Sequence, residues 1–172
     1  MRNRILAALA VVAWSAVASA QTLTISSPEF KAGGNIPSKF TCDAGRTAPN
    51  PALVFGGLPA KTQSLALIMD DPDVPKTLMP SGEFVHWLLW DLAPDAKGIA
   101  EAAGTGGING MGQPGYMGPC PPDKSHRYFF KLYALDTKIT SPIKTKAELV
   151  KAMEGHILQQ AELMGNYERV KK

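Results

Sequence analysis

The segment from Gly112 to Asp136 constrains the fold of this chain more than any other. It reads GQPGYMGPCPPDKSHRYFFKLYALD. Gly and Pro in its first half specify turns and close approach of the backbone, rather than helix or strand. In its second half the side chains alternate as in an extended strand, and one face carries His126, Tyr128, Phe130 and Leu132. A stiff loop therefore leads into a strand that begins with two polar inward-facing side chains, an arrangement typical of a small binding site.

The N-terminus has the pattern of a secretory signal. Arg2 and Arg4 form a basic start, residues 5–17 are apolar apart from Ser15, and Ala18–Ala20 supplies a small-residue cleavage site. The apolar run is too short for an ordinary transmembrane helix, although a retained N-terminal anchor is the alternative. We therefore predict cleavage after Ala20, a periplasmic or secreted product without a transmembrane segment, and a single domain over residues 21–172.

Charge and cysteine content narrow the function further. The net charge is +3, and Arg2 and Arg4 of the signal supply two of those charges, so nothing favours a nucleic-acid partner. Cys42 and Cys120 both follow the signal, and an oxidising compartment would permit a disulfide between them. Two buried free thiols are the alternative. Because the chain lacks Cys-x-x-Cys and His-x-x-x-His spacing, we predict no metal site and no cofactor.

Alternating or apolar runs predict most of the strands. They lie at residues 21–26, 52–55, 64–69, 84–92 and 126–133, with a further brief strand at 39–42. Short strands in succession favour a mainly antiparallel β-fold with peripheral helices.

One C-terminal helix is predicted after these strands. Thr145-x-x-Glu148 has the form of a capping box, which starts a helix. Apolar residues then recur at helical spacing, with Gly165 as the predicted end; they are Val150, Met153, Ile157, Ala161 and Met164. His156 would lie inside this helix, beside a Gly155 that marks a close contact or a break.

Three segments place unusual polar groups beside apolar strands. They are Asp71-Pro72-Asp73, His86, and His126 with Tyr128. Each alone is more typical of a turn or a structural side chain, but together they predict a shared pocket. Imidazole N–H, phenol O–H and Gly-loop N–H groups all donate to phosphate oxygens. Because the carboxylates repel an anion, they would instead orient a His or receive a ligand ammonium group.

Enzymatic alternatives have less support. A His–Asp metal centre fits the residue types, but the spacings are scattered. A serine hydrolase of the usual kind needs Gly-x-Ser-x-Gly, which does not occur. Residues 104–107 lack the Lys of a phosphate-binding P-loop. We therefore predict that the protein is not an enzyme.

Several motifs in order resemble the phosphatidylethanolamine-binding protein family, and its bacterial Raf-kinase-inhibitor-like branch in particular. The motifs are Asp71-Pro72-Asp73-Val74-Pro75, Val85-His86-Trp87, Gly118-Pro119-Cys120-Pro121-Pro122 and His126-Arg127-Tyr128, with Phe40-Thr41-Cys42-Asp43 and Gly155-His156-Ile157-Leu158 typical of the bacterial branch. The resemblance spans nearly all of residues 21–172.

The resemblance implies an antiparallel Greek-key fold with a small pocket for phosphate or a phospholipid head group. The pocket positions carry over to Asp71, Asp73, Pro75, His86, Gly118, Pro119, His126 and Tyr128, with Tyr116 as a further candidate. A protease- or kinase-inhibitor role through the pocket rim is the alternative. Bacterial relatives of the family form homodimers, a state that this sequence neither supports nor excludes. The physiological ligand and partner are not determined by the sequence.

Overall fold

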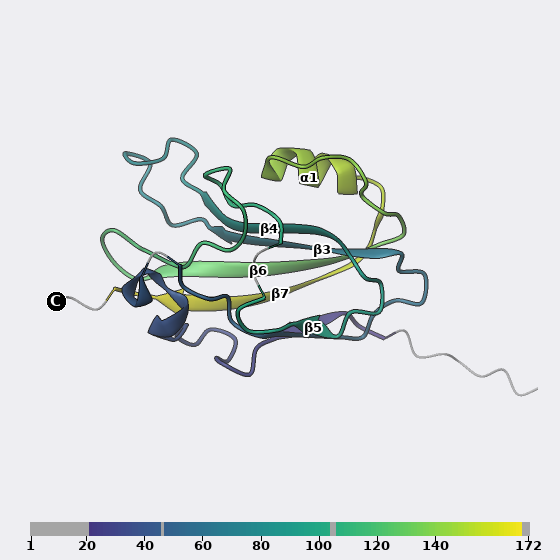
Figure 1. Ribbon diagram of the computed structural model, residues 1–172, viewed down its shortest axis with the longest axis horizontal. Coiled ribbons are helices and arrows are strands. Elements are labelled where there is room, and N and C mark those ends of the chain that lie inside the picture. The colour runs from purple at the N-terminus through teal and green to yellow at the C-terminus, as the bar shows by residue number, and fades with distance from the viewer. Residues whose placement is uncertain (1–20, 46, 104–105, 170–172) are drawn as a thin grey trace, which may run out of the picture.

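The computed structural model describes residues 21–45, 47–103 and 106–169; the predicted signal at residues 1–20 lies outside them. The strands are β1 (Thr24–Ser26), β2 (Leu53–Gly56), β3 (Ser64–Asp71), β4 (Phe84–Leu92), β5 (Gly98–Ile99), β6 (His126–Leu135) and β7 (Ile157–Tyr167). They form a three-stranded sheet in the order β1-β2-β5 and a four-stranded sheet in the order β4-β3-β6-β7. All pairs within the sheets are antiparallel, which confirms the predicted fold class (Figure 1).

Strand β3 is buried along its whole length because both of its faces are covered. Leu65, Leu67 and Met69 belong to the core shared with the three-stranded sheet. Ala66 and Ile68 face the other way, into a second core that includes Leu149 and Met153 of the helix α1 (Lys146–Met153). Burial on both faces explains why this strand reads as a continuous apolar run rather than an alternating one.

Strand β6 alternates as predicted. His126, Tyr128, Phe130 and Leu132 are all fully buried, while Arg127 is exposed. The strand lies between β3 and β7, so its inward side chains meet residues from both neighbours. The buried His126 therefore lies at the end of the sheet where the Gly/Pro-rich loop joins β6.

The predicted C-terminal helix begins where expected but ends much earlier. Thr145 caps α1 with Glu148 in a complete capping box, and the helix stops at Met153. Gly155 adopts φ +77°, a left-handed turn that favours glycine. The prediction of helix as far as Gly165 was wrong: residues 157–167 form β7, which pairs with β6 over almost its whole length. Among the described residues, no helix has both the length and the apolar character to cross a membrane.

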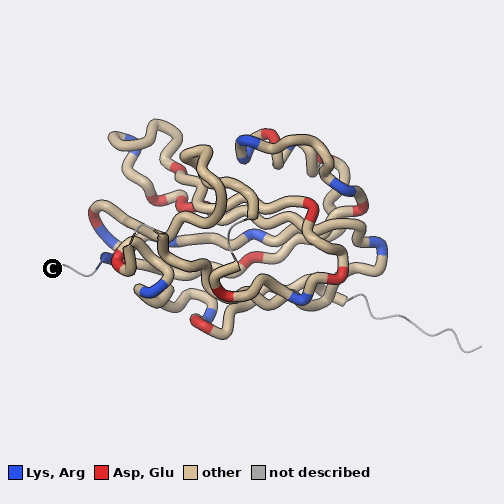
Figure 2. The backbone as a smooth tube through the Cα atoms, in the orientation of Figure 1, with Lys and Arg blue, Asp and Glu red and all other residues tan. Residues whose placement is uncertain are grey.

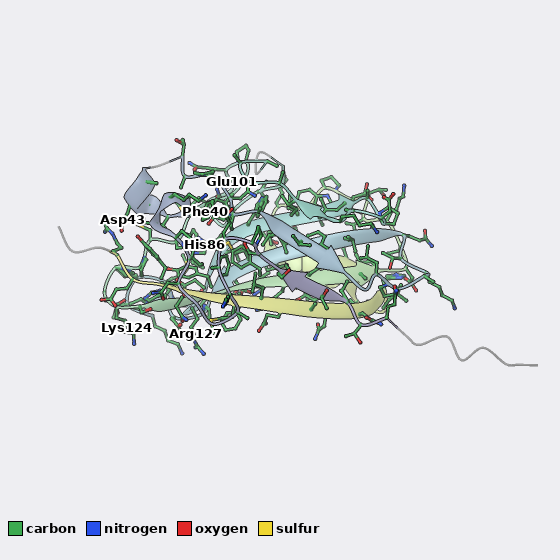
Figure 3. All side chains as sticks on the ribbon, turned by 90° about the horizontal axis from the view of Figure 1, so that it is seen from below. Phe40, Asp43, His86, Glu101, Lys124 and Arg127 are labelled. Atoms are coloured by element: carbon green, nitrogen blue, oxygen red, sulfur yellow. A yellow bond between two sulfur atoms is a disulfide. The ribbon has the colours of Figure 1, made fainter. Side chains whose placement is uncertain are left out.

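The brief strand predicted at residues 39–42 was also wrong. This segment forms two 3-10 turns, η1 (Ser38–Phe40) and η2 (Cys42–Ala44). Cys42 at the start of η2 is bonded to Cys120, with the Cα atoms 5.3 Å apart, so the predicted pairing is confirmed. Figure 3 shows that the labelled Phe40, Asp43 and His86 gather toward one end of the molecule. That end holds the candidate site.

Candidate ligand cavity

The site forms where three strands of the four-stranded sheet meet. Strand β3 runs antiparallel to both β4 and β6, so its last residue lies beside the first residues of its two neighbours. Asp71 ends β3, His86 lies near the start of β4, and His126 starts β6. The sheet register therefore brings together polar residues that are far apart in sequence.

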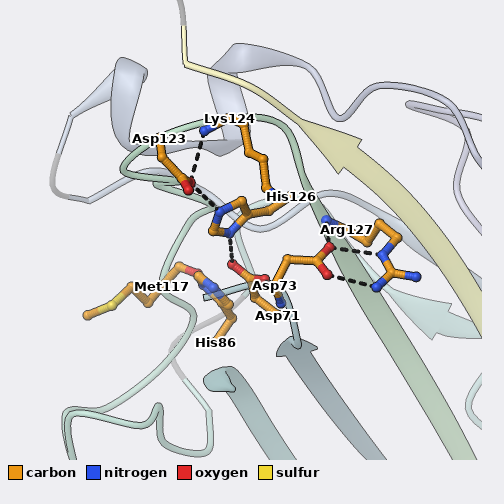
Figure 4. A network of polar contacts seen from close by, with 8 residues as sticks. All are labelled: Asp71, Asp73, His86, Met117, Asp123, Lys124, His126 and Arg127. Carbon is orange, nitrogen blue, oxygen red and sulfur yellow. Dashed lines mark hydrogen bonds and ion pairs between the residues drawn. The ribbon is translucent and has the colours of Figure 1, made fainter. Parts of the chain in front are cut away.

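His126 is held between two carboxylates. Its Nδ1 lies 2.7 Å from Asp71 Oδ2, and its Nε2 lies 2.8 Å from Asp123 Oδ1 (Figure 4). Burial acts to lower the pKa of His126, but the hydrogen bonds to Asp71 and Asp123 outweigh it and raise the pKa. Because a carboxylate accepts, each ring nitrogen donates, and the geometry corresponds to an imidazolium with both donors occupied.

The two carboxylates of the Asp71-Pro72-Asp73 turn have different partners. Asp71 Oδ1 accepts from Asp73 N–H at 2.8 Å, closing the turn. Asp73 accepts from Arg127 through the backbone N–H, Nε and Nη2, at 2.9, 2.9 and 2.7 Å (Figure 4). The hydrogen bonds from Arg127 lower the pKa of Asp73 to about 2. Asp71 therefore orients a His, whereas Asp73 ties the turn to β6.

His86 has the opposite electrostatic character. Its Nδ1 donates to the Met117 carbonyl at 2.7 Å, and Met117 N–H donates back to the His86 carbonyl at 3.0 Å. Burial lowers the pKa of His86 to about 4. At neutral pH the ring is therefore uncharged, and with Nδ1–H committed to Met117, its Nε2 is a hydrogen-bond acceptor.

A cavity of about 240 Å³ opens beside these groups. It is lined by Asp71, Val74, Leu78, Phe84, His86, Met117, Gly118, Cys120 and Pro122. The backbone N–H groups of Gly118 and Cys120 make no hydrogen bond within the described part of the chain. Most of the lining residues are apolar, and Asp71 and His86 contribute one carboxylate and one imidazole. Such a lining suits a ligand with a small polar group attached to an apolar part.

Gly118 is required for space. A Cβ atom at this position would lie 2.7 Å from the Phe40 carbonyl oxygen and 3.0 Å from Thr41 Cα. Both contacts are backbone atoms, which cannot turn aside. Tyr116 holds the same two segments together, because its hydroxyl donates to the Phe40 carbonyl at 2.9 Å. Together with the Cys42–Cys120 bond, these contacts fix the loop that forms one wall of the cavity.

Of the nine residues predicted from the sequence, three line the cavity: Asp71, His86 and Gly118. His126 and Tyr128 lie behind it. The Tyr128 ring contacts His86 edge-on at 5.2 Å and stacks on His126 at 6.5 Å. Burial, and then the negative charge of Asp71, raise the pKa of Tyr128. Its buried hydroxyl has no hydrogen-bond partner among the described residues.

The remaining predicted residues support the wall without lining it. Asp73 binds Arg127, Pro119 accepts from Cys42 N–H at 3.0 Å, and the Pro75 carbonyl accepts from Leu78 N–H at 2.9 Å. Tyr116 packs edge-on against Trp87 at 5.6 Å.

Sequence reasoning missed the apolar lining and Asp123. The lining residues missed are Val74, Leu78, Phe84, Met117 and Pro122, and Cys120 was considered only for its disulfide. Asp123 lies three residues before His126 and directly after two prolines, and that spacing was the available signal.

Charge is spread over the molecule rather than gathered at the site. Lys and Arg positions are interspersed with Asp and Glu positions along the chain (Figure 2). Within the described residues, no group of three or more His, Cys, Asp and Glu side chains is arranged to hold a metal ion.

Comparisons with known proteins cover nearly the whole described chain. Residues 26–168 match the family model described as phosphatidylethanolamine-binding protein. A UPF0098 protein of Chlamydia pneumoniae is 45% identical over 151 residues, covering 86% of this chain and 99% of the relative. A UPF0098 protein of Methanothermobacter thermautotrophicus is 40% identical over 157 residues, with 86% and 99% covered.

Solved structures agree with the sequence relatives. The crystal structure of a phosphatidylethanolamine-binding protein homologue from Chlamydia trachomatis has a TM-score of 0.81 at 39% identity, covering 87% of this chain and 99% of that one. The Escherichia coli protein YbcL, described as a member of the mammalian family, has a TM-score of 0.74 at 27% identity, with 86% and 99% covered.

Proposed function

The chain belongs to the phosphatidylethanolamine-binding protein family, and on that premise we propose that it is a non-enzymatic protein that binds phosphate or phosphorylated head groups in the 240 Å³ cavity. The observation that carries this proposal is that two residues lining the cavity, Gly118 and Cys120, have backbone N–H groups with no hydrogen-bond partner in the described part of the chain. Main-chain donors of this kind bind anionic oxygens without carrying a charge of their own.

The histidines set the protonation state of the ligand. His126 has both donors occupied by carboxylates, so it acts behind the cavity as a buried positive charge. Its charge offsets part of the negative charge of Asp71 and Asp123, and so weakens the repulsion between Asp71 and an anion. His86 presents an acceptor, so it pairs with a phosphate oxygen only when a proton lies between them. A phosphate monoester carries such a proton below its second pKa of about 6. Binding is therefore expected to take up protons near neutral pH.

The apolar part of the wall favours a phosphorylated group attached to carbon over a bare ion. Val74, Phe84 and Pro122 line the cavity, and the rim residue Leu78 is 64% exposed. Asp71 offers its carboxylate to a ligand ammonium group, as phosphoethanolamine would supply.

Two further features support the non-enzymatic and exported parts of the proposal. No Ser or Thr lines the cavity within the described residues, and the Cys120 sulfur is engaged in the disulfide. A disulfide persists in an oxidising compartment, and a periplasmic or secreted location is such a compartment.

Calorimetric titration of phosphoethanolamine tests the proposal. We expect saturable binding by the wild type, loss of binding in His86→Phe, and unchanged binding in His156→Ala. His156 is the matched control because its side chain is 48% exposed and pairs with Asp136, away from the cavity lining. Repeating the titration in buffers of different ionisation enthalpy measures proton uptake. Equal affinities for all three proteins would refute the assignment of the site.

A further inference from the structure

Strand β7 forms one edge of the four-stranded sheet, and part of that edge is open. The order β4-β3-β6-β7 leaves β7 paired with a strand on one side only (Figure 1). On its other side, residues 33–36 cover the C-terminal end through hydrogen bonds to Met164 and Asn166. A register shift in the pairing of residues 157–159 with β6 bounds the other end. The open edge therefore lies at residues 160–162.

The main chain of Gln160 and Glu162 faces the open edge. Met164 and Asn166 direct main-chain groups away from β6, to residues 33–36, in hydrogen bonds of 2.8 Å. Alternate residues of an antiparallel strand direct their N–H and C=O groups to the same side, so Gln160 and Glu162 also direct theirs away from β6. No other described segment forms a main-chain hydrogen bond with these two residues. Each therefore offers one N–H and one C=O to a further extended chain.

The open edge lacks the residues that commonly protect a sheet edge. Natural edge strands are often blocked by Lys or Pro, or covered by another segment. Between Ile157 and Tyr167, β7 contains no Lys, Arg or Pro, and Glu162 is its only charged residue. Gln160 and Glu162 are both exposed. An edge of this kind suits strand addition, in which an extended peptide continues the sheet through main-chain hydrogen bonds.

A row of alternating charges crosses the sheet and ends at Glu162. Lys131 on β6 is directly opposite Glu162 on β7. Its ammonium group nevertheless pairs with the buried carboxylate of Asp70 on β3, at 2.8 Å, and Lys146 pairs with the same carboxylate at 2.6 Å. Glu162 makes no hydrogen bond or ion pair within the described residues. The row from Asp70 through Lys131 to Glu162 therefore lacks the cation that a further strand would place next to it.

A cavity of about 450 Å³ lies beside Glu162 and is lined by Lys131, Tyr133, Gln160, Ala161 and Glu162. Tyr133 is opposite Gln160 in the sheet, just as Lys131 is opposite Glu162. The Tyr133 hydroxyl and the Gln160 side-chain amide make no hydrogen bond within the described residues. An Arg side chain suits this lining, because a guanidinium group pairs with a carboxylate through two N–H groups and stacks on an aromatic ring.

We propose that the open edge of β7 binds an extended segment of another protein, which adds a fifth strand to the sheet and places an Arg opposite Glu162. Main-chain hydrogen bonds to Gln160 and Glu162 hold the segment, and its Arg enters the 450 Å³ cavity beside Tyr133. A second copy of β7 does not meet this requirement, because it has no cation to place opposite Glu162. The inference goes beyond the proposed function, since this cavity and the 240 Å³ cavity share no lining residue.

The test is an NMR titration of the ¹⁵N-labelled full chain with the synthetic peptide acetyl-Thr-Val-Thr-Arg-Thr-Val-Thr-amide, whose residues favour strands. The amide signals of Gln160 and Glu162 should shift saturably. A second peptide, with Glu in place of the Arg, should bind the wild type about fivefold more weakly. Glu162→Lys should reverse this preference. Glu154→Lys is the matched control and should keep it, because Glu154 is also exposed but lies outside β7.

Two further variants separate the main-chain contacts from the phosphate site. Gln160→Pro removes an N–H group that points to the open edge and leaves the pairing of β7 with β6 intact, so it should weaken both peptides about tenfold. His86→Phe should bind both peptides as the wild type does, because His86 lines only the other cavity. Circular dichroism checks the fold of Gln160→Pro, and if that variant does not fold, the charge reversal in Glu162→Lys decides.

Amide signals of Gln160 and Glu162 that stay unmoved at millimolar peptide would overturn the proposal. Equal affinity of the wild type for the two peptides, or the same preference in Glu162→Lys, would overturn it as well. Analytical ultracentrifugation examines the remaining occupant. A wild-type dimer that Gln160→Pro converts to a monomer would show that a second copy fills the open edge, and would contradict binding of a foreign segment there. None of these outcomes bears on phosphate binding, which the calorimetric titration described above tests separately.

Discussion

Removing the Cys42–Cys120 bond tests how strongly the cavity wall depends on it. The two residues are separated by 78 positions in sequence, and the bond joins η2 to the loop that lines the cavity. In the chain-entropy model, closing a loop of this length stabilises the folded state by about 4.5 kcal/mol at most. The Cys42 N–H···Pro119 and Tyr116 O–H···Phe40 hydrogen bonds hold the same segments and remain after the bond is cut. We therefore expect a loss of about 2–4 kcal/mol.

Urea unfolding measures this loss in three samples: the oxidised wild type, the wild type with a dithiol reductant, and Cys42→Ser/Cys120→Ser. Cys120 is exposed, so the reductant can reach the bond. The reduced wild type and the double variant should have similar free energies of unfolding, and the variant should not respond to the reductant. Hydrogen exchange should increase at the hydrogen-bonded amides of Cys42 and Met117. If the free energy of unfolding of the double variant lay within about 0.5 kcal/mol of that of the oxidised wild type, stabilisation of the fold by closing this loop would be refuted.

Three further predictions concern the residues at the cavity. Gly118→Ala should destabilise the fold by about 1–3 kcal/mol and weaken phosphoethanolamine binding, because its Cβ would lie 2.7 Å from the Phe40 carbonyl oxygen. Urea unfolding measures the first effect and calorimetry the second. Unchanged stability and affinity would show that the loop shifts to accept the Cβ atom. Burial lowers the pKa of His86 to about 4, so between pH 6.5 and 4 the unfolded chain binds a proton that the folded one does not, and stability should fall by about 3 kcal/mol as pH falls through this range. His86→Asn should lack that part of the slope, and identical pH profiles would contradict the assignment. Asp71→Asn removes one of the two carboxylates that raise the pKa of His126, so NMR titration should find that pKa lowered, and an unchanged value would mean that Asp123 alone sustains it.

The strands that carry the site were predictable because their patterns are local. The apolar run at residues 84–92 coincides with β4, and the alternation from His126 gives the buried face of β6. The strand after α1 was not predictable, because the apolar residues Ile157, Ala161 and Met164 fit both a helical and an extended period. Pairing with β6 along β7 decides between the two, and no window of sequence contains that interaction. Gly155 was the one local signal of the break.

The sequence indicated several polar residues around the cavity, but not which hydrogen-bond partners they would have. The sequence left open whether Asp71 and Asp73 orient a His or meet a ligand amine. Asp71 orients His126 and also lines the cavity, whereas Asp73 pairs with Arg127. Which ring nitrogen faces which acceptor depends on tertiary geometry. The apolar wall was not predictable, because residues such as Val74 and Phe84 have the same appearance in a core as in a cavity.

Side-chain ¹⁵N NMR of the histidines during a titration with inorganic phosphate tests the central claim most directly. The chain has three His residues, of which only His86 lines the 240 Å³ cavity among the described residues. At neutral pH, His86 Nε2 should begin at the position of an unprotonated acceptor and shift as phosphate saturates the site, while the exposed His156 stays unchanged. A His86 resonance that is unmoved at high phosphate, or a larger shift at His156, would contradict phosphate binding in this cavity.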